Sequence, residues 1–189
     1  MFTPEEKREL VTIARTAIWD ALHGRPYAVQ IPPEGNLSRP GGAFVTLRLN
    51  GDLRGCIGYI QAPVALAEVV AEVAEKAALE DPRFSPLTLE EFEQIRIEIS
   101  VLSPLHRISD INEIVVGTHG LLLELRHSKG LLLPQVADEY GWDRDTFLDN
   151  TARKAGLPRN AWKDPEAVIY VFTAEIIQEE SFASRREGV

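Results

Sequence analysis

An alternating segment interrupted by Asn50-Gly51 constrains the fold more than any other feature of the sequence. The segment reads "GAFVTLRLNGDLRGCIGYI" over residues 42–60. Because Asn-Gly tolerates the positive φ angles of tight hairpin turns, its two halves are predicted to pair as antiparallel strands. Alternation along the second strand then predicts that Arg54 and Cys56 lie on one face, with Gly58 beside them.

The rest of the chain mixes helices and strands without a regular β-α-β order. A capping box of Thr3 and Glu6 begins a helix that is predicted to stop at Gly24. The other predicted elements are an amphipathic helix in 63–81, a half-buried strand in 95–101, a hairpin turning near Lys129-Gly130, one broken or two short helices in 135–157 and a closing strand in 167–178. This order predicts an α+β fold, with a largely antiparallel sheet flanked by helices.

Composition excludes several classes of protein. The 189 residues carry a formal net charge of −9, which argues against general binding to a phosphate backbone. The chain has no signal-like start and no apolar run of about 18 residues, so we expect a cytoplasmic protein without a membrane span. Its single cysteine forms neither an internal disulfide nor a cysteine-based zinc site. Because no ligand spacing is found either, no metal or cofactor is predicted.

Cys56 allows two interpretations. A neighbouring guanidinium favours the thiolate, so Arg54 would make Cys56 a candidate nucleophile or redox group. Gly55 and Gly58 would then let a ligand approach closely. Alternatively, Cys56 is a small packed residue whose glycines relieve crowding. None of the histidines at 23, 106, 119 and 127 is an obvious base for it.

Further polar residues are candidates for the same site. In "DPRFSPL", Asp81 and Arg83 either grip a polar ligand or pair with each other to fix a loop. Gly58 is predicted to leave a gap beside Arg54, which would form an anion pocket with help from Arg83. Glu98 faces away from the apolar side of its strand, and therefore meets either water or a second, polar pocket.

Six motifs in this order resemble the AMMECR family: "GAFVTL", "LRGCIG", "DPRFSPL", "IEISVLSP", "LLLPQVA" and "KAGL". The resemblance runs from about residue 5 to residue 178. It implies one AMMECR-type domain over 1–189, with a larger and a smaller subdomain and a cleft between them. The family signature falls on 53–58 and the second motif on 81–84, while Glu98 and Gln135 match further polar positions. His119 departs from the acidic residue that members often carry.

The resemblance also implies a functional setting. Prokaryotic members belong to a system that includes a Memo-type protein and a radical SAM enzyme, which are the expected partners. One hypothesis places Cys56 and Arg54 at a ligand site for a small anionic or polar molecule, with Gly58, Asp81, Arg83, Glu98 and Gln135 as further binding residues. The alternative is a non-catalytic interaction or adaptor domain that uses the same cleft. Whether the protein is an enzyme stays open at this point.

Overall fold

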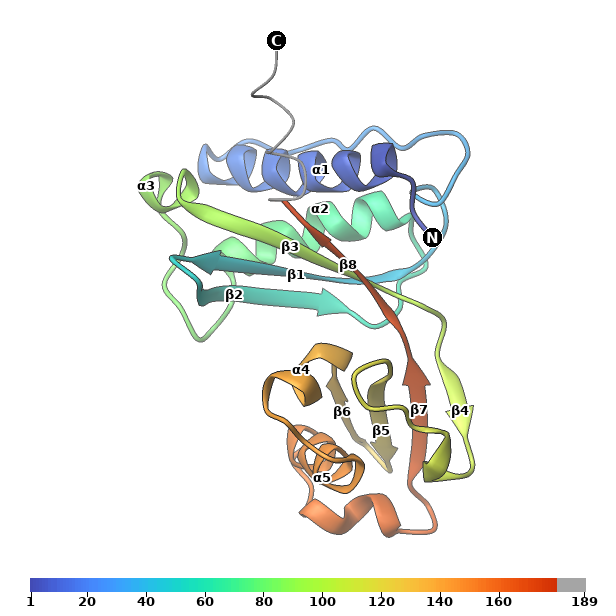
Figure 1. The fold of residues 1–189 in the computed structure, drawn as a ribbon. Coiled ribbons are helices and arrows are strands. Elements are labelled where there is room, and N and C mark those ends of the chain that lie inside the picture. The colour runs from blue at the N-terminus through green and yellow to red at the C-terminus, as the bar shows by residue number, and fades with distance from the viewer. Residues whose placement is uncertain (180–189) are drawn as a thin grey trace. The chain divides into compact units, whose positions relative to one another are not determined.

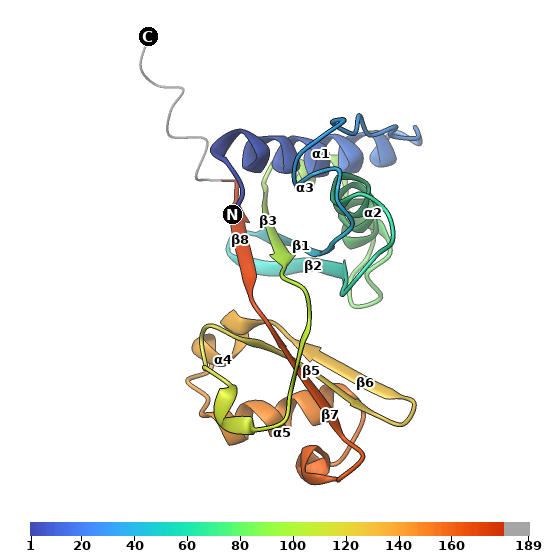
Figure 2. The same ribbon diagram turned by 90° about the vertical axis from the view of Figure 1, so that its right-hand side faces the viewer.

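A computed structural model describes residues 1–179 of the chain. The chain divides into two compact units, one formed by residues 1–102 with 175–179 and the other by residues 103–174. Each unit has its own four-stranded sheet and its own helices, as Figure 1 and Figure 2 show. The mixture of helices with antiparallel strands confirms the predicted α+β class.

The first unit is a sheet with helices on one face. Its strand order is β2-β1-β3-β8, and the pairs β1–β2 and β1–β3 are antiparallel. The strands are β1 (Gly42–Leu49), β2 (Asp52–Tyr59), β3 (Ile95–Leu102) and β8 (Ala174–Gln178), and the helices are α1 (Pro4–Leu22), α2 (Leu66–Leu79) and α3 (Leu89–Phe92). Helices α1 and α2 lie on the same side of the sheet (Figure 1), and their apolar residues form one core with Val45, Ile97 and Ile99.

Local signals decide where the elements of this unit begin and end. The Thr3 hydroxyl accepts the Glu6 N–H at 3.2 Å and the Glu6 carboxylate accepts the Thr3 N–H at 2.8 Å, so the predicted capping box begins α1. After α1, Gly24 adopts a φ of 66°. Asn50 and Gly51 have φ angles of 54° and 91°, which confirms the predicted hairpin turn between β1 and β2.

The second unit is a smaller antiparallel sheet in the order β4-β7-β5-β6. Its strands are β4 (His106–Ile108), β5 (Gly120–Leu125), β6 (Ser128–Leu132) and β7 (Val168–Phe172). Its helical segments are α4 (Pro134–Glu139), α5 (Arg144–Lys154) and the short 3₁₀ turns η1 (Ile111–Glu113) and η2 (Arg159–Lys163). Phe147 and Leu148 of α5 are fully buried against Leu121 and Leu123 of β5. The prediction of two short helices in 135–157 is therefore confirmed.

Two sequence predictions are wrong in detail. The segment 167–178 is not one strand, because the chain leaves the second sheet after β7 and enters the first sheet as β8. The second hairpin turns at Arg126-His127 instead of near Lys129-Gly130, and Arg126 adopts a φ of 56°. Gly130 lies inside β6, where a Cβ atom would be 2.5 Å from the Thr151 carbonyl oxygen of α5. This glycine serves close packing of a helix on a strand, which sequence alone does not distinguish from a turn.

No helix within residues 1–179 combines the length and the apolar character needed to cross a membrane.

Replacing Gly130 by alanine should destabilise the second unit, because the new methyl group would meet the backbone of α5. We expect a loss of about 2 kcal/mol or more in the free energy of unfolding, measured by urea denaturation. Gly41→Ala is the matched control, since its Cβ would be 3.6 Å from Leu66 in ordinary contact. Equal stability of both variants would contradict the close approach of α5 to β6.

Candidate functional site

The strand that carries the signature lies at the edge of the first sheet. Strand β2 pairs only with β1, and at Cys56 its outer side is covered by the loop that follows α2. The Cys56 N–H donates to Asp81 Oδ2 at 2.9 Å, and Arg83 Nη2 donates to the Cys56 carbonyl oxygen at 3.3 Å. Two side chains thus take the place of a neighbouring strand, which satisfies backbone groups that an open edge would expose.

Asp81 and Arg83 also bind each other. Arg83 Nε and Nη2 donate to the two carboxylate oxygens of Asp81 at 2.9 and 2.6 Å, and the Arg83 N–H adds a third bond at 3.1 Å. The Arg83 guanidinium holds the pKa of Asp81 well below its ordinary value, and the N–H groups of Cys56 and Arg83 act in the same direction against the effect of burial. Asp81 is 4% exposed. Of the two roles predicted for this pair, the structure shows the loop-fixing one.

Arg54 is buried and fully engaged. Its Nε and Nη2 both donate to the Glu91 carboxylate at 2.9 Å, and Nη2 lies 3.4 Å from the Pro86 carbonyl oxygen. The guanidinium lowers the pKa of Glu91, whose carboxylate also closes a capping box with Thr88. Because Arg54 is 9% exposed and already holds a carboxylate, it positions α3 against β2.

A β-bulge interrupts the alternation on which the predicted face of Arg54 depends. Leu47 pairs with Gly55 whereas Arg48 pairs with Leu53, which leaves Arg54 as the extra residue of β2. The extra residue shifts the alternation, so Leu53, which pairs with Arg48, shares a face with Cys56, which pairs with Thr46. Alternation along β2 therefore gives no reason to expect the Arg54 guanidinium close to the Cys56 thiol.

The predicted gap at Gly58 is also absent. A Cβ atom on Gly58 would fall on the ring of Phe44, which fills this place from β1. Gly55 has a different role, since its Cβ would collide with the Ala77 carbonyl oxygen of α2. Both glycines of the signature thus permit close packing, and neither opens an anion pocket beside Arg54.

The Cys56 thiol belongs to a polar row that crosses the sheet on the face opposite α1 and α2. Thr46 pairs with Cys56 on one side and with Glu98 on the other. The Thr46 hydroxyl donates to Cys56 Sγ at 3.3 Å, and Gln178 Nε2 donates to Glu98 Oε2 at 3.1 Å. We call Cys56, Thr46, Glu98 and Gln178 the polar row. It contains Cys56 and Glu98, two of the predicted site residues.

A hollow of about 130 Å³ adjoins the Glu98 end of the polar row. Its walls include the guanidinium groups of Arg48 and Arg96, which pair across β1 and β3 on the same face as Glu98. The remaining lining residues are Ile97, Glu98, Gln178 and Glu179. Gln135, the last predicted site residue, is half-buried at the start of α4 in the second unit.

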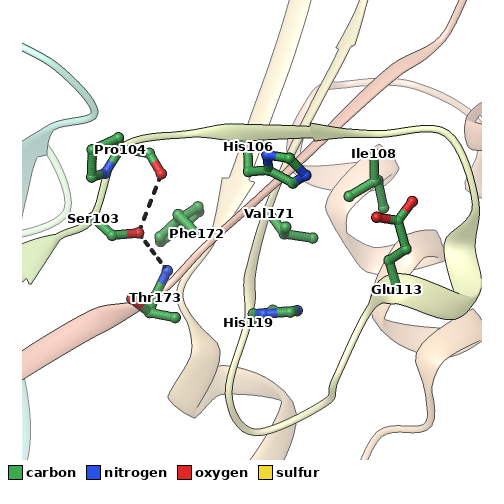
Figure 3. A pocket seen from close by; sticks show the side chains of 9 residues that line it. All are labelled: Ser103, Pro104, His106, Ile108, Glu113, His119, Val171, Phe172 and Thr173. Atoms are coloured by element: carbon green, nitrogen blue, oxygen red, sulfur yellow. Dashed lines mark hydrogen bonds between the residues drawn. The ribbon is translucent and has the colours of Figure 1, made fainter.

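The second unit has a cavity of its own, of about 260 Å³, which the sequence analysis missed (Figure 3). His106 and His119 contribute to its walls, together with Glu113 and the apolar Ile108 and Val171. The remaining lining residues are Ser103, Pro104, Phe172 and Thr173. The only sequence signals are that His106 follows Ser103-Pro104 at the end of a predicted strand and that His119 lies between Gly117 and Gly120. The strand order β4-β7-β5, which brings them to one cavity, has no counterpart in the sequence.

Within residues 1–179, no three His, Cys, Asp or Glu side chains gather in a way that would hold a metal ion. The chemistry of the first unit is therefore that of a thiol, a hydroxyl, a carboxylate and an amide in a line.

Comparison with known proteins decides the family. The AMMECR1 family matches residues 11–177. The chain belongs to the AMMECR1 family. A protein of Aquifex aeolicus is 42% identical over 179 residues, covering 91% of this chain and 92% of its own, and one of Methanothermobacter thermautotrophicus is 42% identical over 184 residues, covering 93% and 95%. The crystal structure of an uncharacterized protein from Pyrococcus horikoshii superposes with a TM-score of 0.83 at 40% identity, covering 90% of each chain. The resemblance found in the motifs is thus confirmed for this AMMECR1 protein.

Replacing Asp81 by asparagine should destabilise the first unit near pH 7, because a buried charge-assisted contact to Arg83 and Cys56 is lost. We expect about 1 to 3 kcal/mol in the free energy of unfolding. The pKa of Asp81 is lowered in the folded state, so its stabilising effect is complete above the unfolded pKa of about 4 and decreases as the pH falls below that value. Asp81→Asn should therefore flatten the acid side of the stability profile, measured by urea denaturation from pH 7 to pH 2.

Asp52→Asn is the matched control, since Asp52 is exposed at the start of β2. If the free energy of unfolding of Asp81→Asn fell between pH 7 and pH 2 as it does in wild type, the Asp81–Arg83 pair would not hold the edge of the sheet.

Proposed function

We propose that this AMMECR1 protein binds a small polar or anionic ligand on the polar row of its first unit, with the Cys56 thiol as part of the site. The proposal includes a Memo-type protein and a radical SAM enzyme as working partners, on the basis of the family resemblance. The observation that carries it is the polar row itself. Side chains with hydrogen-bonding capacity occupy adjacent positions on four neighbouring strands, next to a hollow with two guanidinium groups.

The chemistry of the row favours a polar ligand. Thr46 is 6% exposed and Glu98 is half-buried, so a ligand there would be partly removed from water, where hydrogen bonds contribute most to specificity. The hollow is lined by two arginines and two glutamates, Arg48, Arg96, Glu98 and Glu179, together with the amide of Gln178, so it presents groups of both charges to a polar ligand. Carboxylate and phosphate groups suit guanidinium groups because their oxygens match the planar N–H fork.

The signature residues have separate tasks in this proposal. Asp81 and Arg83 bind the backbone of Cys56 and fix the strand, while Arg54 anchors α3 through Glu91. None of these three is needed to contact the ligand. They hold the Cys56 thiol in place at the end of the row, which leaves Cys56 and Glu98 as the contact residues.

The same geometry favours recognition over nucleophilic catalysis by Cys56. A nucleophilic thiol needs a base within hydrogen-bond distance, but the contact to Sγ comes from the Thr46 hydroxyl, which donates. His23 is the only histidine of the first unit, and its Nδ1 lies 2.8 Å from the Trp19 carbonyl oxygen at the end of α1. A non-catalytic contact surface for one of the partners is therefore the second candidate function, on the same row.

Alkylation by iodoacetamide tests whether the thiol is presented as proposed. Cys56 should react in the folded protein, and Thr46→Val should lower its labelling rate at pH 7 by about three- to tenfold, because the hydroxyl that stabilises negative charge on sulfur is lost. The rate is followed by mass spectrometry of the intact protein. Thr12→Val is the control, since the Thr12 hydroxyl bonds only within α1.

Binding is tested by native mass spectrometry of protein purified from its own host. Wild type should retain a small molecule that Glu98→Gln and Cys56→Ala lose, while Cys56→Ala stays within about 1 kcal/mol of wild-type stability. Loss of a protein partner in place of a small molecule would support the contact-surface function. An inert thiol, together with a Cys56→Ala variant destabilised by several kcal/mol, would show that Cys56 is a packed core residue and would overturn both functions.

A further inference from the structure

The sheet of the second unit places two imidazole rings on either side of one strand. His106 stands at the start of β4 and His119 directly before β5, and both strands pair with β7. Two strand spacings separate β4 from β5, which is about 10 Å. Because Gly120 pairs with Phe172, His119 is also displaced by about two residues along β7 from the position of His106, so the two backbones are about 12 Å apart. Figure 3 shows the two rings on opposite sides of Val171, with the ring of His119 seen edge-on. Val171 pairs with His106 and lines the cavity together with both histidines.

The spacing suits one flat group between the two rings. Aromatic rings stack or tilt against each other with centroids about 4.5 to 7 Å apart, so two successive contacts span a distance close to that between the two strands. The floor is apolar, because Ile108, Val171 and Phe172 are each less than 10% exposed. A volume of about 260 Å³ is slightly below the range of drug-sized sites, and therefore fits one small ring system.

His119 is held in place by the loop that carries it. The Val115 N–H donates to His119 Nδ1 at 3.2 Å, and the His119 N–H donates back to the Val115 carbonyl oxygen at 2.9 Å. Since Nδ1 is an acceptor, a neutral ring carries its proton on Nε2. The ring is thus oriented before any ligand arrives, which lowers the entropy cost of binding.

The rim of the cavity selects for nitrogen-bearing ligands. Glu113 Oε1 accepts the N–H groups of Ser109 and Asp110 at 3.3 and 3.1 Å, which fixes η1 as one wall. Its Oε2 has no hydrogen-bond donor among residues 1–179, and is therefore available to the N–H or amino group of a ligand. The carboxylate also disfavours an anionic ligand in this position. A neutral base fits better than a phosphate or a carboxylic acid.

We propose that this cavity of the second unit binds a planar nitrogen heterocycle of one or two rings, stacked between His106 and His119 over Val171. The heterocycle directs an N–H or amino group to Glu113. This site is separate from the polar row of the first unit and does not depend on the ligand proposed there.

His106 is the residue through which the site can be tested. Its side chain is exposed and makes no hydrogen bond or ion pair within the described part of the chain, so its replacement should leave the fold intact. His106→Ala removes the stacking surface, whereas His106→Phe keeps it. His23→Ala, at the end of α1 in the first unit, is the control for the loss of an exposed histidine.

The experiment titrates the full-length protein with adenine and nicotinamide as planar probes and with cyclohexanecarboxamide as a saturated control. The imidazole Cε1–H signals of all four histidines are followed by NMR. We expect dissociation constants in the millimolar range for the planar probes, with upfield ring-current shifts for His106 and His119 and none for His23 and His127. His106→Ala should weaken binding by about fivefold or more, while His106→Phe stays within about twofold of wild type.

Three results would overturn the proposal. The first is an absence of His106 and His119 shifts with both planar probes up to about 20 mM, a concentration at which even very weak contacts are occupied. The second is equal binding of cyclohexanecarboxamide, which would show an apolar hollow without selection for flat rings. The third is unchanged adenine binding by His106→Ala. Because the shifts that decide the test are those of His106 and His119 in the second unit, failure here leaves the proposal for the polar row standing.

Discussion

The Asp81 carboxylate is the point on which the first unit depends. It is buried, it accepts two bonds from the Arg83 guanidinium, and it accepts the backbone N–H of Cys56. A buried carboxylate is costly unless its oxygens are satisfied, and here the satisfying groups come from a strand and from a loop. The loop that follows α2 is therefore fastened to the edge of β2. This contact closes the sheet on the side where no further strand covers it.

The tight packing of α2 on β2 makes that contact possible. Gly55 lets the helix backbone come so close that a methyl group would meet the Ala77 carbonyl oxygen. Asp81 follows the helix directly and so emerges beside the strand. Arg54, the extra residue of the bulge, fixes the other end of the same loop through Glu91. Most of the residues in the family signature thus serve one structural purpose, which is to attach a helix and its loop to an edge strand. The Cys56 thiol is the exception, because it belongs to the polar row.

The two units present different chemistry. The first offers guanidinium, carboxylate, amide and thiol groups on the sheet face opposite its helices, which suits a polar ligand. The second offers two imidazoles over an apolar floor, which suits a flat ring. Both lie within the span shared with relatives at about 40% identity.

Local chemistry determined much of this protein from sequence alone. The capping boxes at Thr3 and Thr88, the Asn50-Gly51 turn and the alternating strand in 95–101 were predictable, because each depends on residues within a few positions of one another. The motifs likewise determined the family.

Only the tertiary structure decided the bulge at Arg54, the ring of Phe44 over Gly58, the helix against Gly130 and the division of 167–178 between two sheets. Each of these depends on a partner distant in sequence, and the same is true of the line from Cys56 to Glu98 and of the pair His106 and His119. Alternation and composition predict the faces of one strand at a time. A site is formed by residues on several strands, and the sequence pattern does not say which strands pair.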